Sequence, residues 1–220
     1  MLNIVILGPQ GSGKGTQARL IAAEYGLPHF SPGQLFRSEI EKGSPLGRQV
    51  ADYVKRGEIV PTALAESVIQ ERLARPDTER GLILDGFPRL QEQALQLDRI
   101  MERLGRKVTH AIKLDITDAT AYVRLTGRLE CTNKSCATSF HQALRPPAAA
   151  GLCDKCLSPL APRQDDEAGA IRRRLEIYHS ETEPLANFYQ AKGVLHDINA
   201  ERPVDEIFAE IKGILGKPVQ

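Results

Sequence analysis

An apolar run that ends in a glycine-rich loop is the feature that most constrains the fold of this chain. Residues 2–7 read Leu-Asn-Ile-Val-Ile-Leu, and the loop Gly8–Thr16 that follows has glycine at four of its nine positions. Apolar residues at helical spacing from Ala18 to Tyr25 then predict a helix that ends at Gly26. This order of strand, loop and helix is typical of phosphate-binding sites, because backbone N–H groups and the helix N-terminus face the anion.

The lysine of the loop supports this interpretation, because Lys14 adds a positive charge where a polyphosphate would lie. The common pattern has serine or threonine directly after this lysine, whereas here Gly15 holds that position and the hydroxyl follows at Thr16. A glycine-rich turn without a ligand is the alternative, and the preceding strand together with the lysine argues against it. We predict phosphate contacts from Gly11, Ser12, Gly13, Lys14, Gly15 and Thr16.

The charge balance limits the kinds of partner. The 220 residues include 29 Lys and Arg and 28 Asp and Glu, which gives a net charge of +1. Such a chain has no overall field that would hold nucleic acid or an anionic membrane surface. Its apolar stretches are too short for a membrane span or a signal peptide. We expect a cytoplasmic monomer without nucleic-acid or membrane partners, in which anion binding is local.

Strand-like and helix-like segments alternate along the chain, which predicts an α/β fold with a parallel sheet flanked by helices. Further strands are expected at 81–85, 108–115 and 194–198. Helices are expected at 65–73, 91–104, 119–127, 168–189 and 204–215. A chain of this length is compatible with one principal core that carries small excursions.

Two segments interrupt the alternation. Residues 31–60 are rich in proline and glycine and predict a small helical excursion. Residues 128–164 hold all four cysteines and little helical periodicity, and predict an inserted lobe. The core then comprises residues 1–30, 61–127 and 165–220.

The cysteines predict a metal site in this lobe. They form two close pairs, Cys131 with Cys136 and Cys153 with Cys156, the layout of a tetrahedral thiolate site that leaves no position open for water. A lobe with little apolar core gains its fold from such an ion, whereas disulfides are rare in cytosolic proteins; free thiols are the other alternative. Zinc is the expected structural ion, and thiolate ligands also admit iron or cobalt. His141 is close enough in sequence to replace Cys136, although a solvated loop histidine is the simpler interpretation.

A second motif, Leu82–Arg89, ends a buried strand with a carboxylate, a tight turn and an arginine. Ligands of open α/β sheets bind at the carboxyl ends of the strands. Asp85 is therefore placed to hold Mg²⁺ through water beside the loop phosphates, and Arg89 to bind a second anionic group. A helix-capping aspartate and a surface arginine would be the alternative for either residue alone.

Together these motifs resemble the adenylate kinase family, in its long form with a metal-binding lid, over essentially the whole chain. The resemblance implies a P-loop NTPase-like sheet that holds ATP on the phosphate loop, an excursion that closes over AMP, and a lobe that closes over ATP as a lid. The resemblance is carried by the phosphate loop, the cysteines and four further segments, namely Arg56–Pro61, Leu84–Arg89, Arg124–Arg128 and Arg163–Asp166.

The resemblance also implies individual roles. Lys14 is the phosphate-binding lysine, Arg37 and Arg89 clamp the phosphate of AMP, and Gln93 reads the adenine of AMP. The arginines that converge on the transferring phosphoryl group are Arg124, Arg128, Arg163 and Arg174, the last two also contacting AMP. Further AMP contacts are implied at Pro32, Glu58, Ile59, Val60, Gly86, Phe87 and Pro88, and the segment Ala200–Arg202 is implied near the adenine of ATP.

The implied reaction is reversible phosphoryl transfer from MgATP to AMP, which gives two ADP. An acceptor phosphate is already ionised at neutral pH, so this reaction needs positioning and cationic stabilisation rather than a general base. Three alternatives stay open: another nucleoside-monophosphate kinase with GTP as donor or UMP or CMP as acceptor, a P-loop regulatory ATPase, and a zinc-ribbon nucleic-acid binder. The last is disfavoured because Phe140 is the one aromatic residue of the lobe available for stacking on bases.

Overall fold

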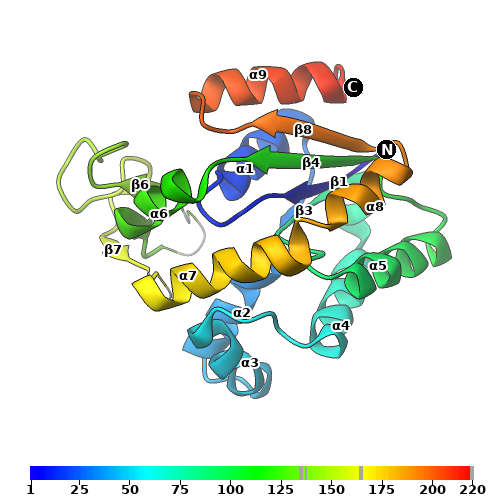
Figure 1. Ribbon diagram of the computed structural model, residues 1–220, viewed down its shortest axis with the longest axis horizontal. Helices are drawn as coiled ribbons and strands as arrows, with labels where there is room; N and C mark the ends of the chain where they lie inside the picture. Colours follow the sequence, from blue (N-terminus) through cyan, green and yellow to red (C-terminus); the bar gives the residue numbers. More distant parts are fainter. Residues whose placement is uncertain (134–135, 137, 164–165, 219–220) are drawn as a thin grey trace.

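The computed structural model describes residues 1–133, 136, 138–163 and 166–218. Its main sheet has five parallel strands in the order β2-β3-β1-β4-β8 (Figure 1). The strands are β1 (Leu2–Leu7), β2 (His29–Phe30), β3 (Gly81–Asp85), β4 (His110–Asp115) and β8 (Leu195–Asn199). Parallel neighbours need crossover connections, which the helices supply. The predicted α/β fold with a parallel sheet is therefore confirmed.

Helices cover both faces of this sheet. On one face lie α1 (Lys14–Tyr25) and α9 (Val204–Leu215), and on the other lie α4 (Thr62–Leu73), α5 (Gln91–Arg103) and α8 (Leu185–Ala191). Strand β1 serves both cores, because Ile4 and Ile6 face α1 and α9 whereas Val5 and Leu7 face the other layer. A strand buried on both faces needs apolar residues at consecutive positions, which explains the run that opens the chain.

Two helices follow β2 and form the excursion expected around residues 31–60. These are α2 (Pro32–Glu41) and α3 (Pro45–Arg56), and each begins with proline, whose missing N–H has no partner at a first helical position in any case. Phe36, Val50 and Val60 form a small apolar cluster that packs this part against Val68 of α4. The helical character matches the prediction, while the boundaries of the excursion stay predictions.

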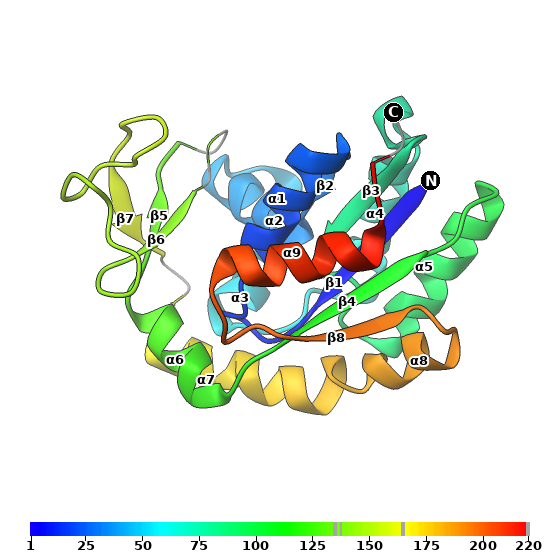
Figure 2. The ribbon, with the colours of Figure 1, turned by 90° about the horizontal axis from the view of Figure 1, so that it is seen from above.

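A separate antiparallel sheet lies at one end of the molecule, beside α6 (Asp118–Thr126) (Figure 1 and Figure 2). It consists of β5 (Arg128–Cys131), β6 (Ser139–His141) and β7 (Leu160–Pro162), in the order β6-β5-β7. Its core combines Phe140, Leu129 and Leu160 with the four cysteines. The predicted limits of this lobe stay predictions, and Gln164 and Asp165 at its end lie outside the described residues.

One predicted helix is wrong. The segment expected as a single helix at 168–189 is α7 (Ala168–Ile177), then a π-helical turn at Tyr178–Thr182, then α8. In that turn Glu183 N donates to the carbonyl oxygen of Tyr178, five residues back, at 2.7 Å. Pro184 follows and has no N–H with which to continue an α-helical ladder.

Strand β2 has no sequence signal at all, because two residues are too few to show alternation.

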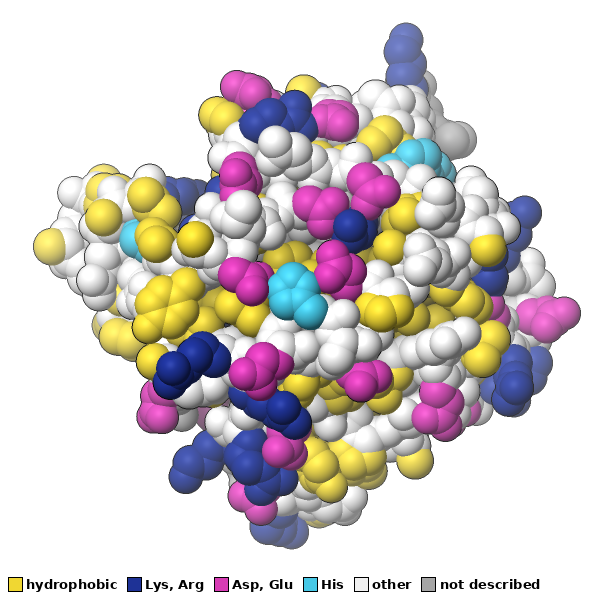
Figure 3. Space-filling view, in the orientation of Figure 1, with side chains coloured by type: hydrophobic (Ala, Val, Ile, Leu, Met, Phe, Trp, Pro, Cys, Tyr) yellow, Lys and Arg dark blue, Asp and Glu magenta, His cyan; other side chains and the backbone are white. Residues whose placement is uncertain are grey.

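The surface agrees with the nearly balanced charge of the chain. On the face seen in Figure 3, acidic and basic side chains are mixed rather than gathered in one large area of a single sign. Within the part of the chain that the structure describes, every helix is too short or too polar to cross a membrane.

Candidate active site

The phosphate loop leads directly into α1. Gly13 caps this helix with a φ of 93°, a left-handed conformation that favours glycine. Lys14 Nζ donates hydrogen bonds to the carbonyl oxygens of Gly8 and Pro9, at 2.7 and 2.6 Å, so its side chain folds back over the loop. The pKa of Lys14 is lowered to about 7, mainly by burial and further by three nearby arginines, with Asp85 acting in the opposite direction. Lys14 is thus a cation that a bound anion would stabilise.

Asp85 ends β3 beside this loop. A Cβ placed on Gly15 would lie 3.2 Å from Asp85 Oδ2. A side chain directly after Lys14 would therefore lie tightly against the Asp85 carboxylate, and Gly15 avoids this contact. His29 on β2 places Nε2 3.2 Å from Asp85 Oδ2. Burial alone would raise the pKa of Asp85, but the hydrogen bond with His29 and the positive charges of Lys14 and Arg19 outweigh burial and keep this pKa below its ordinary value.

A cavity of about 640 Å³ opens over the phosphate loop. This volume lies in the range of small-molecule sites in proteins. The residues predicted to bind ATP all line it, namely Gly11, Ser12, Gly13, Lys14, Gly15, Thr16, Asp85, Arg128 and Arg202, together with Arg124.

A second, smaller cavity adjoins the first, and the two share walls formed by Gln10, Gly33, Arg37, Gly86, Arg89 and Arg163. Pro88 lines the larger cavity, whereas the other predicted AMP contacts line the smaller one: Pro32, Arg37, Glu58, Ile59, Val60, Gly86, Phe87, Arg89, Gln93, Arg163 and Arg174. The structure therefore brings the two predicted groups of residues, which are scattered over the sequence, into two neighbouring spaces.

One buried carboxylate orients two of the predicted arginines. Arg128 donates two hydrogen bonds to Asp166, both at 2.7 Å, and Arg174 donates a third at 2.8 Å. The Asp166 side chain is 6% exposed, so water does not compete for these bonds. Arg163 lies 3.5 Å from Glu130. Asp166 thus fixes the guanidinium groups of Arg128 on β5 and Arg174 on α7. Arg128 lines the larger cavity and Arg174 the smaller one.

Arg124 and Arg202 border the loop after β8. Arg124 donates to the carbonyl oxygen of Ala200 at 3.1 Å. Arg202 Nε donates to the carbonyl oxygen of Asn199, also at 3.1 Å, and the same guanidinium contacts Glu210. Both arginines line the larger cavity at the loop where the resemblance places the adenine of ATP.

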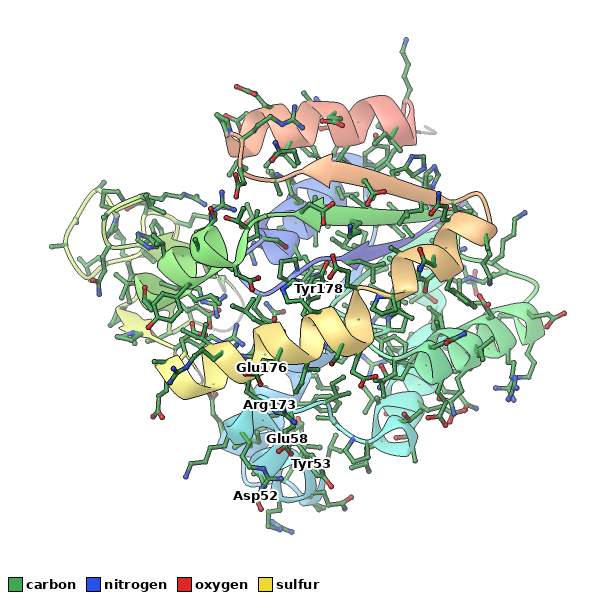
Figure 4. The ribbon with its side chains drawn as sticks, viewed as in Figure 1. Asp52, Tyr53, Glu58, Arg173, Glu176 and Tyr178 are labelled. Carbon is green, nitrogen blue, oxygen red and sulfur yellow. The ribbon has the colours of Figure 1, made fainter. Side chains whose placement is uncertain are left out.

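The excursion docks on α7 through the turn after α3. Gly57 has a φ of 72° and packs so closely that a Cβ there would lie 2.9 Å from the carbonyl oxygen of Ala170. A hydrogen bond with Arg56, at 3.0 Å, lowers the pKa of the neighbouring Glu58, and the charge of Arg173 on α7 adds to this effect. Figure 4 shows Glu58 and Arg173 in the space between α3 and α7. The smaller cavity is therefore closed on the α7 side by the packed turn at Gly57.

The four cysteines meet in one cluster. Their Sγ atoms all lie within 4.8 Å of one another, with Cys131 to Cys156 at 3.4 Å and Cys136 to Cys153 at 3.7 Å. An ion bound tetrahedrally at about 2.3 Å requires sulfur atoms roughly 3.8 Å apart, whereas a disulfide requires about 2.05 Å. Hydrogen bonds from Ser158 lower the pKa of Cys156 to about 6, which favours its thiolate, whereas burial raises the pKa of Cys131. The donor set fits a closed four-thiolate site, and the disulfide alternative is wrong.

His141 does not join this cluster. Its Nε2 lies 3.0 Å from the carbonyl oxygen of Val123 on α6, and its Nδ1 accepts hydrogen bonds from the N–H groups of Ala143 and Leu144. Among the described residues the metal-ligand cluster consists of the cysteines alone. His141 is more than a solvated loop residue, because it ties β6 to α6.

Some residues in or beside the larger cavity carry no signal in the sequence. His29, which contacts Asp85, lies on a strand too short to predict. Arg19 occupies an ordinary position in α1, and Tyr178 lies in the π-helical turn. Arg145 lies in a stretch of the lobe without periodicity. These residues are brought to the site by the packing of strands and lobe, which a linear pattern does not express.

The fold and the two adjoining cavities define a nucleotide-binding phosphotransferase of the P-loop class. A family model described as adenylate kinase matches residues 6–194. The adenylate kinase of Geobacillus sp. (strain WCH70) is 40% identical over 215 residues, which cover 98% of this chain and 99% of that protein. The corresponding enzyme of Symbiobacterium thermophilum is 39% identical over 211 residues, 96% of this chain and 97% of the relative, and that of Bacillus subtilis is 38% identical over 98% of both chains. This chain belongs to the adenylate kinase family.

Proposed function

We propose that the chain transfers the terminal phosphoryl group of ATP to AMP, reversibly and with Mg²⁺, giving two ADP. The observation that carries this proposal is that the phosphate loop opens into one cavity, Gln93 lines the other, and Arg37, Arg89 and Arg163 line both. Two nucleotides bound there would bring their phosphate ends together at the shared walls. The family model and the names of the relatives support the same reaction.

In the larger cavity the phosphate loop is proposed to hold the donor. Its backbone N–H groups and the first turn of α1 would bind the phosphates, with Lys14 as a point charge. Asp85 would hold Mg²⁺ through water, and this ion supplies charge neutralisation between the phosphates when bound. The segment Ala200–Arg202, whose Ala200 carbonyl oxygen accepts a hydrogen bond from Arg124, would border the adenine end.

Where the two cavities adjoin, arginines from both would stabilise the charge that spreads over the transferring group. Arg128 and Arg174 are held in place by Asp166, so they need little reorganisation when phosphate arrives. Arg124 and Arg163, which both line the larger cavity, complete the proposed set. The acceptor oxygen of AMP is already ionised, so the side chains only position it and exclude water.

The acceptor base would be selected by Gln93. This side chain is 2% exposed, and its Oε1 accepts a hydrogen bond from Arg89 N at 2.9 Å. Its Nε2, which has no hydrogen-bond partner among the described residues, can then donate to N1 of adenine. Guanine and uracil present an N–H donor at the equivalent edge, and two buried donors that face each other cost about 1–3 kcal/mol. This supports AMP over GMP and UMP.

The lobe is proposed to carry a structural Zn²⁺ on Cys131, Cys136, Cys153 and Cys156, with iron or cobalt as the other ions that thiolates admit. Reduced thiols of this kind are typical of a reducing compartment, which supports a cytoplasmic location. Both cavities are lined within one chain, which supports a monomer.

A coupled assay of ADP formation, run with AMP, CMP, UMP and GMP as acceptors and with ATP and GTP as donors, tests the proposal. The expected result is a kcat/KM for the ATP–AMP pair that exceeds every other combination by at least about tenfold. A higher value for CMP or UMP, or ATP consumption that needs no monophosphate, would assign the protein to one of the alternatives.

A further inference from the structure

Two arginines that the proposed reaction does not use line the larger cavity, one from the core and one from the lobe. Arg19 lies on α1, one turn after Gly15, and Arg145 lies in the loop that follows β6. A Cβ on Gly15 would lie 3.7 Å from Arg19 Nη1, so the Arg19 side chain runs back along α1 toward the phosphate loop. Both cations therefore belong to the space in which a donor nucleotide would lie.

Charged side chains surround the guanidinium of Arg19. It is half-buried, and among the described residues its guanidinium forms no hydrogen bond and no ion pair. Burial lowers its pKa, the carboxylates of Asp85 and Glu130 raise it, and the positive charge of Arg145 lowers it. A partly desolvated cation without a contacting acceptor is unfavourable. Arg19 is thus suited to an anion that the described part of the chain does not provide.

Arg145 is held in place by the lobe. Its guanidinium carbon lies 5.7 Å from the centre of the Phe140 ring, and Phe140 is buried against Cys131 and Cys153. The backbone of Arg145 pairs with His141 in both directions, with N–O distances of 2.9 and 3.3 Å. A guanidinium stacked on a ring keeps its in-plane N–H donors available. No carboxylate of the described residues forms an ion pair with it.

We propose that Arg19 and Arg145 together form a phosphate subsite between α1 and the lobe, filled by a phosphate group of the bound donor nucleotide. The inference rests on the proposed function in so far as a nucleotide occupies the larger cavity. Two guanidinium groups that face the same space repel each other, and a phosphate between them turns this repulsion into attraction. Because each element supplies one arginine, a phosphate held by both also draws the lobe onto the core. The adjoining phosphate loop favours the nucleotide's own polyphosphate over free phosphate as the occupant.

Isothermal titration of ATP into the full-length, metal-loaded protein tests this subsite, with the variants Arg19→Gln, Arg145→Gln and the double variant. The control is Arg172→Gln, because Arg172 is exposed on α7 and lines neither cavity. Each single variant is expected to raise the Kd for ATP about five- to tenfold, as for the loss of a charge-assisted hydrogen bond at a partly exposed site. The double variant should lose less than the product of the two single losses, because both arginines bind one anion. The Kd for AMP and the control variant should change by less than about twofold.

Further titrations separate the sources of the phosphate and the roles of the side chains. Inorganic tripolyphosphate should lose affinity in both single variants by about the same factor as ATP. Inorganic phosphate that binds to ATP-saturated wild type but not to either variant would assign the same subsite to free phosphate. Unchanged affinity for ATP, tripolyphosphate and inorganic phosphate would overturn the subsite. An equal loss of affinity for adenosine and for ATP in Arg145→Gln would also overturn it, because Arg145 would then act on the nucleoside and not on a phosphate. The assay of ADP formation by the wild-type protein tests the proposed function separately. If the wild type is inactive but the variants lose affinity as expected, the proposed function is refuted and the subsite is kept.

Discussion

The low pKa of Lys14 makes donor binding depend on pH. A group with a pKa of about 7 is about 90% charged at pH 6 and about 90% neutral at pH 8. A bound triphosphate places negative charge near Nζ, which favours the charged form and raises the pKa of Lys14 toward that of an ordinary lysine. The protein is therefore expected to take up a proton when it binds ATP at pH 8.

The size of the effect follows from this titration. The Kd for ATP scales with 1 + 10^(pH − 7), which grows from about 1.1 at pH 6 to about 11 at pH 8, a tenfold loss of affinity or about 1.4 kcal/mol. The low pKa of Lys14 has the opposite effect on the free energy of unfolding, which rises with pH while the affinity for ATP falls. The unfolded chain keeps the lysine proton up to about 10.5, so it binds more protons than the native state above pH 7, and this residue makes the unliganded protein more stable as the pH rises toward 10.5.

Titration calorimetry in two buffers of different ionisation enthalpy measures the Kd for ATP and the number of protons taken up on binding. With excess Mg²⁺, which keeps the terminal phosphate of ATP ionised, we expect uptake of about 0.9 proton per ATP at pH 8 and about 0.1 at pH 6. Lys14→Met is the matched control and should show no uptake at either pH. A Kd that is constant from pH 6 to 8, with no proton uptake at pH 8, would refute the reasoning.

Three further outcomes are expected. Lys14→Met should lower turnover about 10³-fold in the coupled assay while the protein stays folded, because it removes a cationic contact and little packing volume. Near-normal turnover would contradict the phosphate-loop assignment. Arg89→Ala should raise the KM for AMP about 10- to 100-fold, more than the KM for ATP, by deleting a charge-assisted phosphate contact; equal kinetics for both substrates would show that the smaller cavity is not the acceptor site. Elemental analysis should find about one metal per chain, and chelation or Cys153→Ser should lower the melting temperature and expose the lobe to protease first; a metal-free protein whose stability the mutation leaves unchanged would remove the structural role.

The parts of the site that could be predicted from the sequence are those with a local signal. The phosphate loop is contiguous, and its glycines and Lys14 act through the backbone that they shape. Asp85 could be predicted because it ends an apolar strand, and parallel strands present their carboxyl ends at one edge of the sheet. The cluster of cysteines could also be predicted from a local signal. Each pair is close in sequence, so its two ligands already lie side by side.

The parts that could not be predicted depend on contacts between distant segments. His29 reaches Asp85 only because the two-residue β2 pairs with β3, and that pairing has no periodic signal. Arg19 and Arg145 share a cavity only through the placement of the lobe. The break in the helix at 168–189 had a local cause in Pro184, but the strong helical pattern on both sides of the proline hid the π-helical turn before it.

The π-helical turn at Tyr178–Thr182 bears on how this chain can vary in evolution. An α-helix advances about 100° per residue, and a π-helical turn holds one residue more than an α-helical one, so the turn sets the rotation of everything that follows. Thr182 donates a hydrogen bond to the carbonyl oxygen of Arg89 at 3.0 Å, while Leu185 and Tyr189 are buried under the sheet. Deletion of a single residue between 178 and 182 would keep the composition nearly intact yet rotate α8 by about a quarter-turn, carrying both core side chains away from the sheet. Natural relatives should therefore differ here by exchange of side chains and hardly ever by insertion or deletion.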